Sequence, residues 1–177
     1  MNKTHGIIVF GLNGSGKTTL GRELARILKF KHMDQEDYYF RKSEIPYTDA
    51  RSYEDCLNLM VEDIEKYGSF VLSACTGDFD EKITQFYELG VYITAPGEIR
   101  MKRIEQREYD KFGDRICKGG DLYRQHLEFR NFAESRSLTP VEQYAKTLKC
   151  PVIRVDGTID WRENAGNIAE RFIDLVK

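Results

Sequence analysis

Residues 6–19 constrain this chain more strongly than any other stretch. Their sequence is Gly-Ile-Ile-Val-Phe-Gly-Leu-Asn-Gly-Ser-Gly-Lys-Thr-Thr. The apolar run at 7–10 predicts a buried strand, because it is short, rich in β-branched residues and followed by Gly11. Apolar residues then recur on one helical face, at Leu20, Leu24, Ile27 and Leu28. The stretch therefore predicts a strand, a glycine-rich turn and a helix in direct succession.

The glycine-rich turn has the spacing G-x-x-x-x-G-K-[ST] of a phosphate-binding loop, with Gly11, Gly16, Lys17 and Thr18 at the defined positions. Glycines let backbone N–H groups approach phosphate oxygens, and the following helix adds its positive N-terminal dipole. The lysine can reach the β- and γ-phosphates of a nucleoside triphosphate, and the threonine hydroxyl can bind Mg²⁺. The loop residues expected to contact the nucleotide are Gly11, Asn13, Gly14, Ser15, Gly16, Lys17, Thr18 and Thr19.

Length and composition limit the classes of protein that fit the chain. Its 177 residues suit one domain, and 41% hydrophobic with 32% charged residues is typical of a globular protein. A net charge of −2 gives no overall attraction to nucleic acid or to an anionic membrane. No apolar stretch approaches the ~20 residues of a membrane span. The 4 cysteines have no zinc-site spacing. We expect one cytoplasmic domain over residues 1–177, monomeric or homodimeric, without a nucleic-acid or membrane partner.

Strand and helix patterns alternate along the rest of the chain. Further strands are predicted at 30–33, 69–75, 91–95 and 151–155, and the pairs Ser52/Asp55 and Thr139/Glu142 resemble helix N-terminal caps. Alternation of this kind predicts an α/β fold with a parallel sheet covered by helices on both faces. Ligands of such sheets gather at the carboxyl ends of the strands. This edge would bring together residues 11–18, 34–37, 73–78, 95–97 and 156–158.

An acidic cluster follows the second predicted strand. Asp34 is the best candidate for a partner of Mg²⁺, because no acid follows the third predicted strand before Asp78. It can instead accept the proton of a hydroxyl group that receives a phosphoryl group. Glu36 and Asp37 are lesser candidates for holding such an acceptor. A solvated turn without a functional role would have the same composition, so a functional cluster and a solvated turn both stay open.

Arginines suited to phosphate chemistry lie in the segment 98–109, which is helical in propensity. Arg100, Arg103 and Arg107 share one helical face. For Arg103 and Arg107, which precede a glycine-bearing loop, we favour a role on the nucleotide phosphates or the adenine face. For Arg100 we favour a solvated surface position. Arg115 and Arg136 fit either a lid over the nucleotide or the general surface.

Aromatic residues concentrate between the acidic cluster and the next helix. Tyr38, Tyr39, Phe40 and Tyr47 either stack on a planar acceptor or pack a small subdomain. Two arginines of the same region, Arg41 and Arg51, either bind an anionic acceptor or are exposed.

With these residues in view, the chain resembles the P-loop small-molecule kinases, which include nucleoside monophosphate, shikimate, gluconate and nucleoside kinases. The similarity is specific in the phosphate loop, in Asp34-Gln-Glu36, in Arg103-x-x-x-Arg107 and in Val-Asp-Gly157-Thr. The resemblance implies a three-layer P-loop NTPase fold with a five-stranded parallel sheet. It also implies an acceptor-binding region at about 35–66, a short lid at about 108–121, and a turn at Gly157 beside the adenine ring.

The segment after the third predicted strand departs from two branches of this family. It reads Ser-Ala-Cys-Thr-Gly-Asp over residues 73–78, without the aspartate and arginine of adenylate-type kinases or the glycine run of shikimate kinases. The resemblance therefore predicts a phosphotransferase that moves the γ-phosphoryl group of Mg-ATP to a hydroxyl or phosphate group of an unassigned small molecule. Its catalytic residues would be Lys17, Asp34, Arg103 and Arg107, with Thr18 and Asp34 at the metal. The alternative is a P-loop NTPase or nucleotide-sensing module without a small-molecule acceptor.

Overall fold

The computed structural model describes residues 3–45 and 47–177. Its strands are β1 (Gly6–Phe10), β2 (Lys31–Asp34), β3 (Phe70–Ala74), β4 (Tyr87–Thr94) and β5 (Val152–Asp156). The helices are α1 (Lys17–Leu28), α2 (Gln35–Tyr39), α3 (Tyr53–Tyr67), α4 (Glu81–Thr84), α5 (Gly97–Phe112), the 3₁₀ helix η1 (Gly113–Ile116), α6 (Tyr123–Ser135), α7 (Thr139–Thr147) and α8 (Trp161–Val176). All five strands pair in parallel in the order β2-β3-β1-β4-β5, which confirms the predicted fold class.

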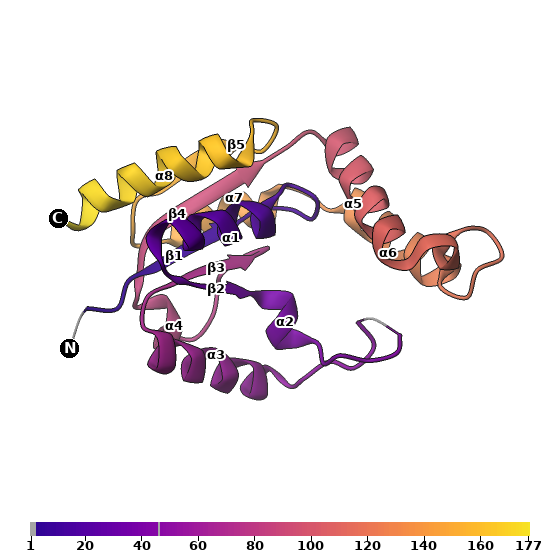
Figure 1. Cartoon of the computed structure of the whole chain (residues 1–177), viewed down its shortest axis with the longest axis horizontal. Helices are drawn as coiled ribbons and strands as arrows, with labels where there is room; N and C mark the ends of the chain where they lie inside the picture. The colour runs from indigo at the N-terminus through magenta and orange to yellow at the C-terminus, as the bar shows by residue number, and fades with distance from the viewer. Residues whose placement is uncertain (1–2, 46) are drawn as a thin grey trace.

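Helices cover both faces of the sheet (Figure 1). Side chains of a strand alternate between the two faces. Ile7 and Val9 of β1 pack in the core cluster with α1 and α8, whereas Ile8 and Phe10 pack in the cluster with α3 and α7. All four are fully buried, because β1 is the central strand. Burial on both faces is the reason that this strand is a continuous apolar run.

Strand β4 begins at Tyr87, before the strand predicted at 91–95. The predicted strand begins after Gly90, but this glycine pairs with Val152 inside the sheet. A Cβ at Gly90 would lie 2.9 Å from Cδ1 of Leu148, so the glycine allows close packing within the strand.

The helix cap predicted at Thr139 is wrong. Ser52 caps α3 as expected, since its side chain accepts a hydrogen bond from the Asp55 N–H at 3.1 Å. Thr139 instead lies inside α7, whose N-cap position is taken by Leu138. The Thr139 N–H donates to the Ser137 hydroxyl at 3.1 Å, so the preceding serine satisfies this donor.

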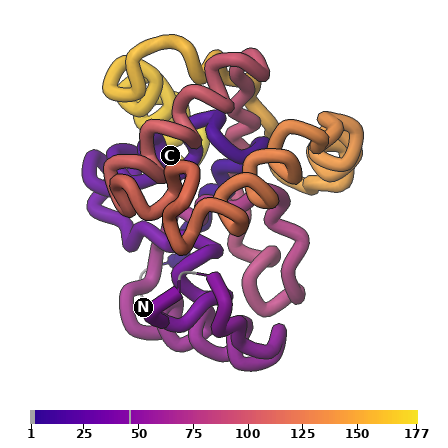
Figure 2. The backbone as a smooth tube through the Cα atoms, turned by 90° about the vertical axis from the view of Figure 1, so that its right-hand side faces the viewer, coloured from indigo at the N-terminus to yellow at the C-terminus, as the bar shows by residue number. Residues whose placement is uncertain are grey.

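Helices α5 and α6 project beyond the carboxyl ends of the strands (Figure 1). They pack on each other through a small separate core of Met101, Ile104, Phe129 and Ala133. Figure 2, viewed from this side, shows α5 and α6 above the purple segment that contains α2 and α3. Helix α5 extends to Phe112 and thus occupies the start of the predicted lid at 108–121. No helix within the described residues is long and apolar enough to cross a membrane.

Candidate active site

The phosphate loop leaves β1 and leads directly into α1. Gly14 and Gly16 have φ angles of 77° and 106°, in the region that favours glycine. A Cβ at Gly14 would lie 2.4 Å from the carbonyl oxygen of Arg100, so a side chain is excluded there by contact as well. The Lys17 ammonium lies back over the loop and donates to the Leu12 carbonyl at 3.0 Å. The loop thus has the tight backbone that its glycine spacing predicts.

Thr18 and Asp34 meet beside this loop. The Thr18 hydroxyl donates to Oδ2 of Asp34 at 2.7 Å, and Oδ1 of Asp34 accepts from the Glu36 N–H at 3.1 Å. Asp34 is therefore both the last residue of β2 and the N-cap of α2. The described residues contain no group of three His, Cys, Asp or Glu side chains that would hold a metal alone. The hydroxyl and carboxylate suit Mg²⁺, which takes few protein oxygens and completes its shell with phosphate and water.

Burial lowers the pKa of Lys17, because the ammonium loses water in the cleft. The nearby Cys75, Glu36 and Asp34 act in the opposite direction but do not outweigh burial. A desolvated cation of this kind is a strong site for an anion. The electrostatics of the cleft therefore favour a bound phosphate next to Lys17.

Arg103 joins two segments of the predicted nucleotide site. Its guanidinium donates to the Ser15 carbonyl at 3.2 Å and to the Gly157 carbonyl at 2.8 Å. Arg107, one turn further along α5, donates to Glu108 at 3.2 Å. Both arginines line the cleft that contains the phosphate loop, which has a volume of about 510 Å³. The structure thus brings Arg103, Arg107 and Gly157 to the loop, while their roles stay predictions.

Arg100 and Arg136 contact the loop residue Asn13. Arg100 is only 8% exposed and donates to the Asn13 carbonyl at 3.2 Å, so the solvated position favoured for it is wrong. Arg136, from the end of α6, donates to Oδ1 of Asn13 at 2.8 Å and lies 3.1 Å from the Cys75 sulfur. Arg115 has a surface position and pairs with Asp121 at 2.6 Å.

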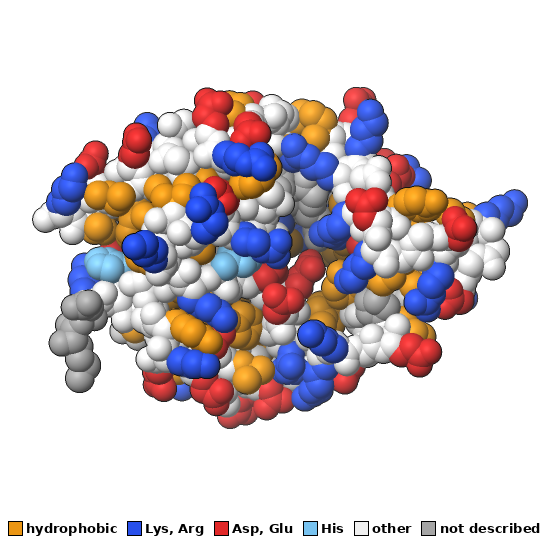
Figure 3. Space-filling model, viewed as in Figure 1, with side chains coloured by type: hydrophobic (Ala, Val, Ile, Leu, Met, Phe, Trp, Pro, Cys, Tyr) orange, Lys and Arg blue, Asp and Glu red, His pale blue; other side chains and the backbone are white. Residues whose placement is uncertain are grey.

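An apolar cavity adjoins the phosphate cleft. Its volume is about 440 Å³, and it lies among residues of α2, the following loop, α5, η1 and α6. Asn13, Glu36 and Tyr47 line both the cavity and the cleft, so the two spaces meet at these side chains. In Figure 3 acidic side chains gather in the hollow between the sheet and the α5–α6 lobe, and basic side chains surround it. The two adjoining spaces can hold two ligands side by side.

The phosphate-loop segment and its surroundings match a known family. The AAA_18 family, described as an AAA domain, matches residues 7–118. A shikimate kinase of Clostridium botulinum is 30% identical over 115 residues, which cover 59% of this chain and 67% of that protein. The chain belongs to this AAA domain family, and with it to the P-loop small-molecule kinases.

Other known proteins are similar to this P-loop kinase over nearly its whole length. The uncharacterized protein YqaC of Bacillus subtilis is 25% identical over 172 residues, covering 93% of this chain and 95% of that protein. A solved shikimate kinase from Acinetobacter baumannii, in complex with shikimate, has a TM-score of 0.56 at 16% identity, covering 97% of this chain and 94% of that one. A sugar kinase from Janibacter sp. has a TM-score of 0.56 at 15% identity, covering 97% and 95%. These two structures show the shared fold.

In this P-loop kinase the aromatic residues after β2 divide into two groups. Tyr38 belongs to the main core and donates to Asp63 of α3. Burial, followed by the hydrogen bond to this carboxylate, raises the pKa of Tyr38. Phe40 and Tyr47 line the apolar cavity, with their ring centroids 5.3 Å apart in an edge-to-face arrangement. The packing interpretation is therefore confirmed for Tyr38, while stacking of Phe40 or Tyr47 on an acceptor stays a prediction.

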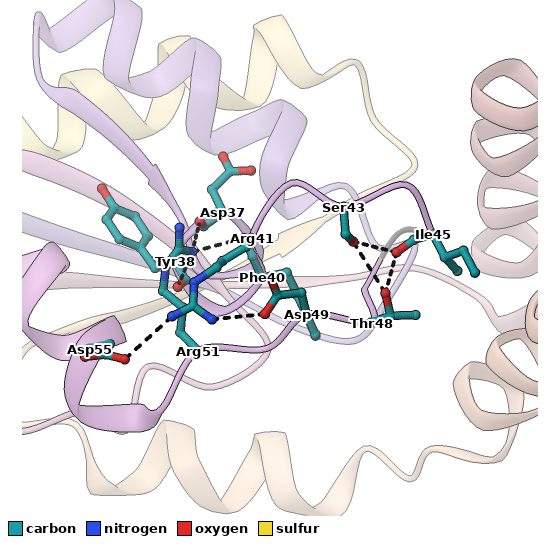
Figure 4. A network of polar contacts seen from close by, with 10 residues as sticks. All are labelled: Asp37, Tyr38, Phe40, Arg41, Ser43, Ile45, Thr48, Asp49, Arg51 and Asp55. Atoms are coloured by element: carbon teal, nitrogen blue, oxygen red, sulfur yellow. Dashed lines mark hydrogen bonds and ion pairs between the residues drawn. The ribbon is translucent and has the colours of Figure 1, made fainter.

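The two arginines of the predicted acceptor region bind the protein itself (Figure 4). Arg51 donates to the carbonyls of Asp37, Tyr38 and Phe40 at 3.2, 3.0 and 3.0 Å, and so holds the end of α2. Arg41 pairs with Asp49 at 3.0 Å. Neither arginine lines the cavity. Their positions therefore do not support the hypothesis that Arg41 and Arg51 bind an anionic acceptor.

Proposed function

We propose that this protein transfers the γ-phosphoryl group of Mg-ATP to a small-molecule acceptor. The observation that carries the proposal is the junction of the phosphate cleft and the apolar cavity at Asn13, Glu36 and Tyr47. Phosphoryl transfer is achieved mainly by positioning a donor and an acceptor in line and by stabilising charge. The polar phosphate cleft for the donor, joined to the apolar cavity for the acceptor, meets that requirement.

On the donor side, the loop N–H groups and Lys17 hold the β- and γ-phosphates. Arg103 and Arg107 stabilise charge on the transferred group, and the turn at Gly157 lies beside the adenine ring. Mg²⁺ bound at Thr18 and Asp34 would neutralise charge on the phosphates. The cleft lined by these side chains supports this assignment.

On the acceptor side, two carboxylates differ in their hydrogen bonding. Both oxygens of Asp34 accept hydrogen bonds, from Thr18 and from the Glu36 N–H. This geometry favours Asp34 as a partner of the metal. The Glu36 side chain lines both spaces, which favours it as the group that receives the acceptor proton.

Acceptor-dependent formation of ADP tests the proposal. Wild-type protein is incubated with Mg-ATP and panels of nucleosides, nucleotides and hydroxy acids, and ADP and phosphorylated product are measured. We expect ADP only with an acceptor, and none from Lys17→Ala, because the ammonium on the phosphates is lost. The matched control is Lys102→Ala, an exposed lysine of α5, which should keep full activity. ADP formed equally without any acceptor would indicate the NTPase alternative, and unchanged turnover in Lys17→Ala would refute the assignment.

A further inference from the structure

The cavity beside the phosphate cleft has walls suited to a ring. Its apolar lining comes from two stretches of the chain, 40–47 and 112–132, that meet only in the fold: Phe40, Tyr47, Phe112, Ile116, Leu122, Phe129 and Phe132. The volume of about 440 Å³ lies within the range of small-molecule pockets. Aromatic walls favour planar or cyclic apolar groups. The cavity is therefore shaped for a small molecule with a ring rather than for an extended polar chain.

The charged residues of the cavity are acids. Glu36, Glu108 and Glu128 line it together with the imidazole of His126, and none of its lining residues within the described chain is a lysine or an arginine. Glu108 is 5% exposed and pairs with Arg107, while Glu128 pairs with Arg124 at 3.0 Å. These two arginines do not line the cavity, so its own surface presents carboxylates.

The electrostatic environment of Tyr47 agrees with this acidic character. Burial raises the pKa of Tyr47 to about 12, and Glu36 and Glu108 contribute in the same direction, while the positive charge of Arg107 opposes them without outweighing them. A negative charge placed in the cavity would meet the same burial and the same two carboxylates. Groups that donate hydrogen bonds, or that carry a positive charge, would instead be stabilised.

We infer that the acceptor is a neutral or cationic molecule with an aromatic or similar apolar ring and a hydroxyl group, and that carboxylated acceptors are rejected. The inference rests on the proposed phosphotransfer and specifies its second substrate. The ring occupies the apolar cavity, and the hydroxyl lies at Glu36, where the cavity meets the phosphate cleft. In the transfer, the hydroxyl oxygen forms a bond to the γ-phosphorus and its proton passes to the Glu36 carboxylate. The bond from that phosphorus to the bridging oxygen breaks, and ADP leaves with the electron pair.

Three phenols of matched size test the charge preference. Tyrosol is neutral, tyramine is cationic and 4-hydroxyphenylacetate is anionic, while all three share the ring and a hydroxyl. Binding to the full chain is measured by NMR titration, with and without a non-hydrolysable Mg-ATP analogue. We expect tyrosol and tyramine to bind at least about tenfold more tightly than 4-hydroxyphenylacetate, because like charges placed together are strongly unfavourable. Equal or tighter binding of the anion, or no binding of any of the three, would overturn the inference.

Variants on one helix test the location of this site. Phe129→Ala removes a cavity wall of α6 and should weaken tyrosol binding about tenfold, by loss of aromatic contact. Tyr123→Ala, on the same helix but outside the cavity lining, should leave it unchanged. If Phe129→Ala lowers the melting temperature, Phe40→Ala tests the opposite wall. Equal effects of the cavity and control variants would place the ligand elsewhere and overturn the inference.

The substrate preference and the proposed activity can fail separately. Tyrosol binding without phosphate transfer from ATP to any acceptor would contradict the proposed function and still support the cavity assignment. Rapid phosphorylation of a carboxylated acceptor such as shikimate, with neutral ring alcohols inactive, would support the function and overturn the inference.

Discussion

The guanidinium of Arg136 donates a hydrogen bond of 2.8 Å to the side-chain oxygen of Asn13, although 123 positions separate the two residues. This contact joins the end of α6 to the phosphate loop. Arg100 holds the backbone carbonyl of the same asparagine at 3.2 Å. Asn13 also lines both the phosphate cleft and the apolar cavity. The conformation of the loop is therefore coupled to the α5–α6 lobe that covers the second space.

Loss of the Arg136 contact should impair turnover. We expect Arg136→Ala to lower kcat/KM by about tenfold or more, because a hydrogen bond from a charged donor contributes ~1.5–3 kcal/mol. Steady-state kinetics with varied ATP would measure the change. Arg26→Ala is the matched control, since Arg26 forms an exposed pair with Glu23 on α1 and should leave the kinetics unaltered. Equal values of kcat/KM for the two variants would show that the hydrogen bond from Arg136 to Asn13 does not contribute to catalysis.

The pKa of Glu36 predicts an unusual dependence of stability on pH. Burial, followed by the charge of Asp34, raises this pKa above its ordinary value of 4.5, although the side chain faces the open cleft. The folded state therefore binds the Glu36 proton more tightly than the unfolded state. Its contribution to stability is present below pH 4.5 and decreases as pH rises through the elevated folded pKa.

Glu36→Gln should accordingly stabilise the protein at pH 7 and have little effect below pH 4.5, where wild-type Glu36 is protonated in both states. Urea unfolding midpoints at the two pH values would measure this difference. Glu170→Gln, at an exposed position of α8, provides the control and should change neither midpoint. A lower midpoint for Glu36→Gln at pH 7 would contradict the prediction.

Replacing glycine by alanine should have different effects at two positions, on nucleotide binding at Gly157 and on the stability of the fold at Gly166. A Cβ at Gly157 would lie 2.4 Å from the Ser15 carbonyl oxygen, so Gly157→Ala should displace the phosphate loop and weaken nucleotide binding. At Gly166, inside α8, a Cβ would meet nothing within 4 Å. Gly166→Ala should therefore stabilise the protein by ~0.5–1 kcal/mol through helix propensity. Thermal unfolding and nucleotide titration of both variants would test this, and unchanged nucleotide affinity in Gly157→Ala would contradict the expected clash.

Features that depend on neighbouring residues were predictable from sequence. The spacing of Gly11, Gly16, Lys17 and Thr18 predicts a strand, loop and helix, and β1 and α1 lie there. The Ser52 cap is equally local. The Thr139 cap was wrong because α7 begins one residue earlier than expected, and the Glu142 N–H that such a cap would bind donates to the Leu138 carbonyl at 3.0 Å. The exact first residue of a helix is therefore less predictable than the helix itself.

The surroundings of charged side chains were less predictable. Arg100, Arg103 and Arg107 are similar in sequence, yet Arg100 is buried against Asn13 and Arg103 joins Ser15 to Gly157. Their partners lie far away along the chain, so helical spacing alone did not distinguish them. The sequence favoured Asp34 over Glu36 as the residue that accepts the acceptor proton. The proposed role now goes to Glu36, because only the fold places it between the phosphate cleft and the apolar cavity.

The amino-acid sequence by itself determined the parallel α/β sheet and the phosphate loop, because both follow from periodicity and spacing within short contiguous segments. The tertiary structure alone decided which arginines reach the loop and that an acidic, aromatic cavity adjoins the cleft. That cavity exists because α2 and the loop after it meet the successive elements α5, η1 and α6, which lie far away along the chain. No local pattern specifies such an approach, since it depends on how separate elements pack.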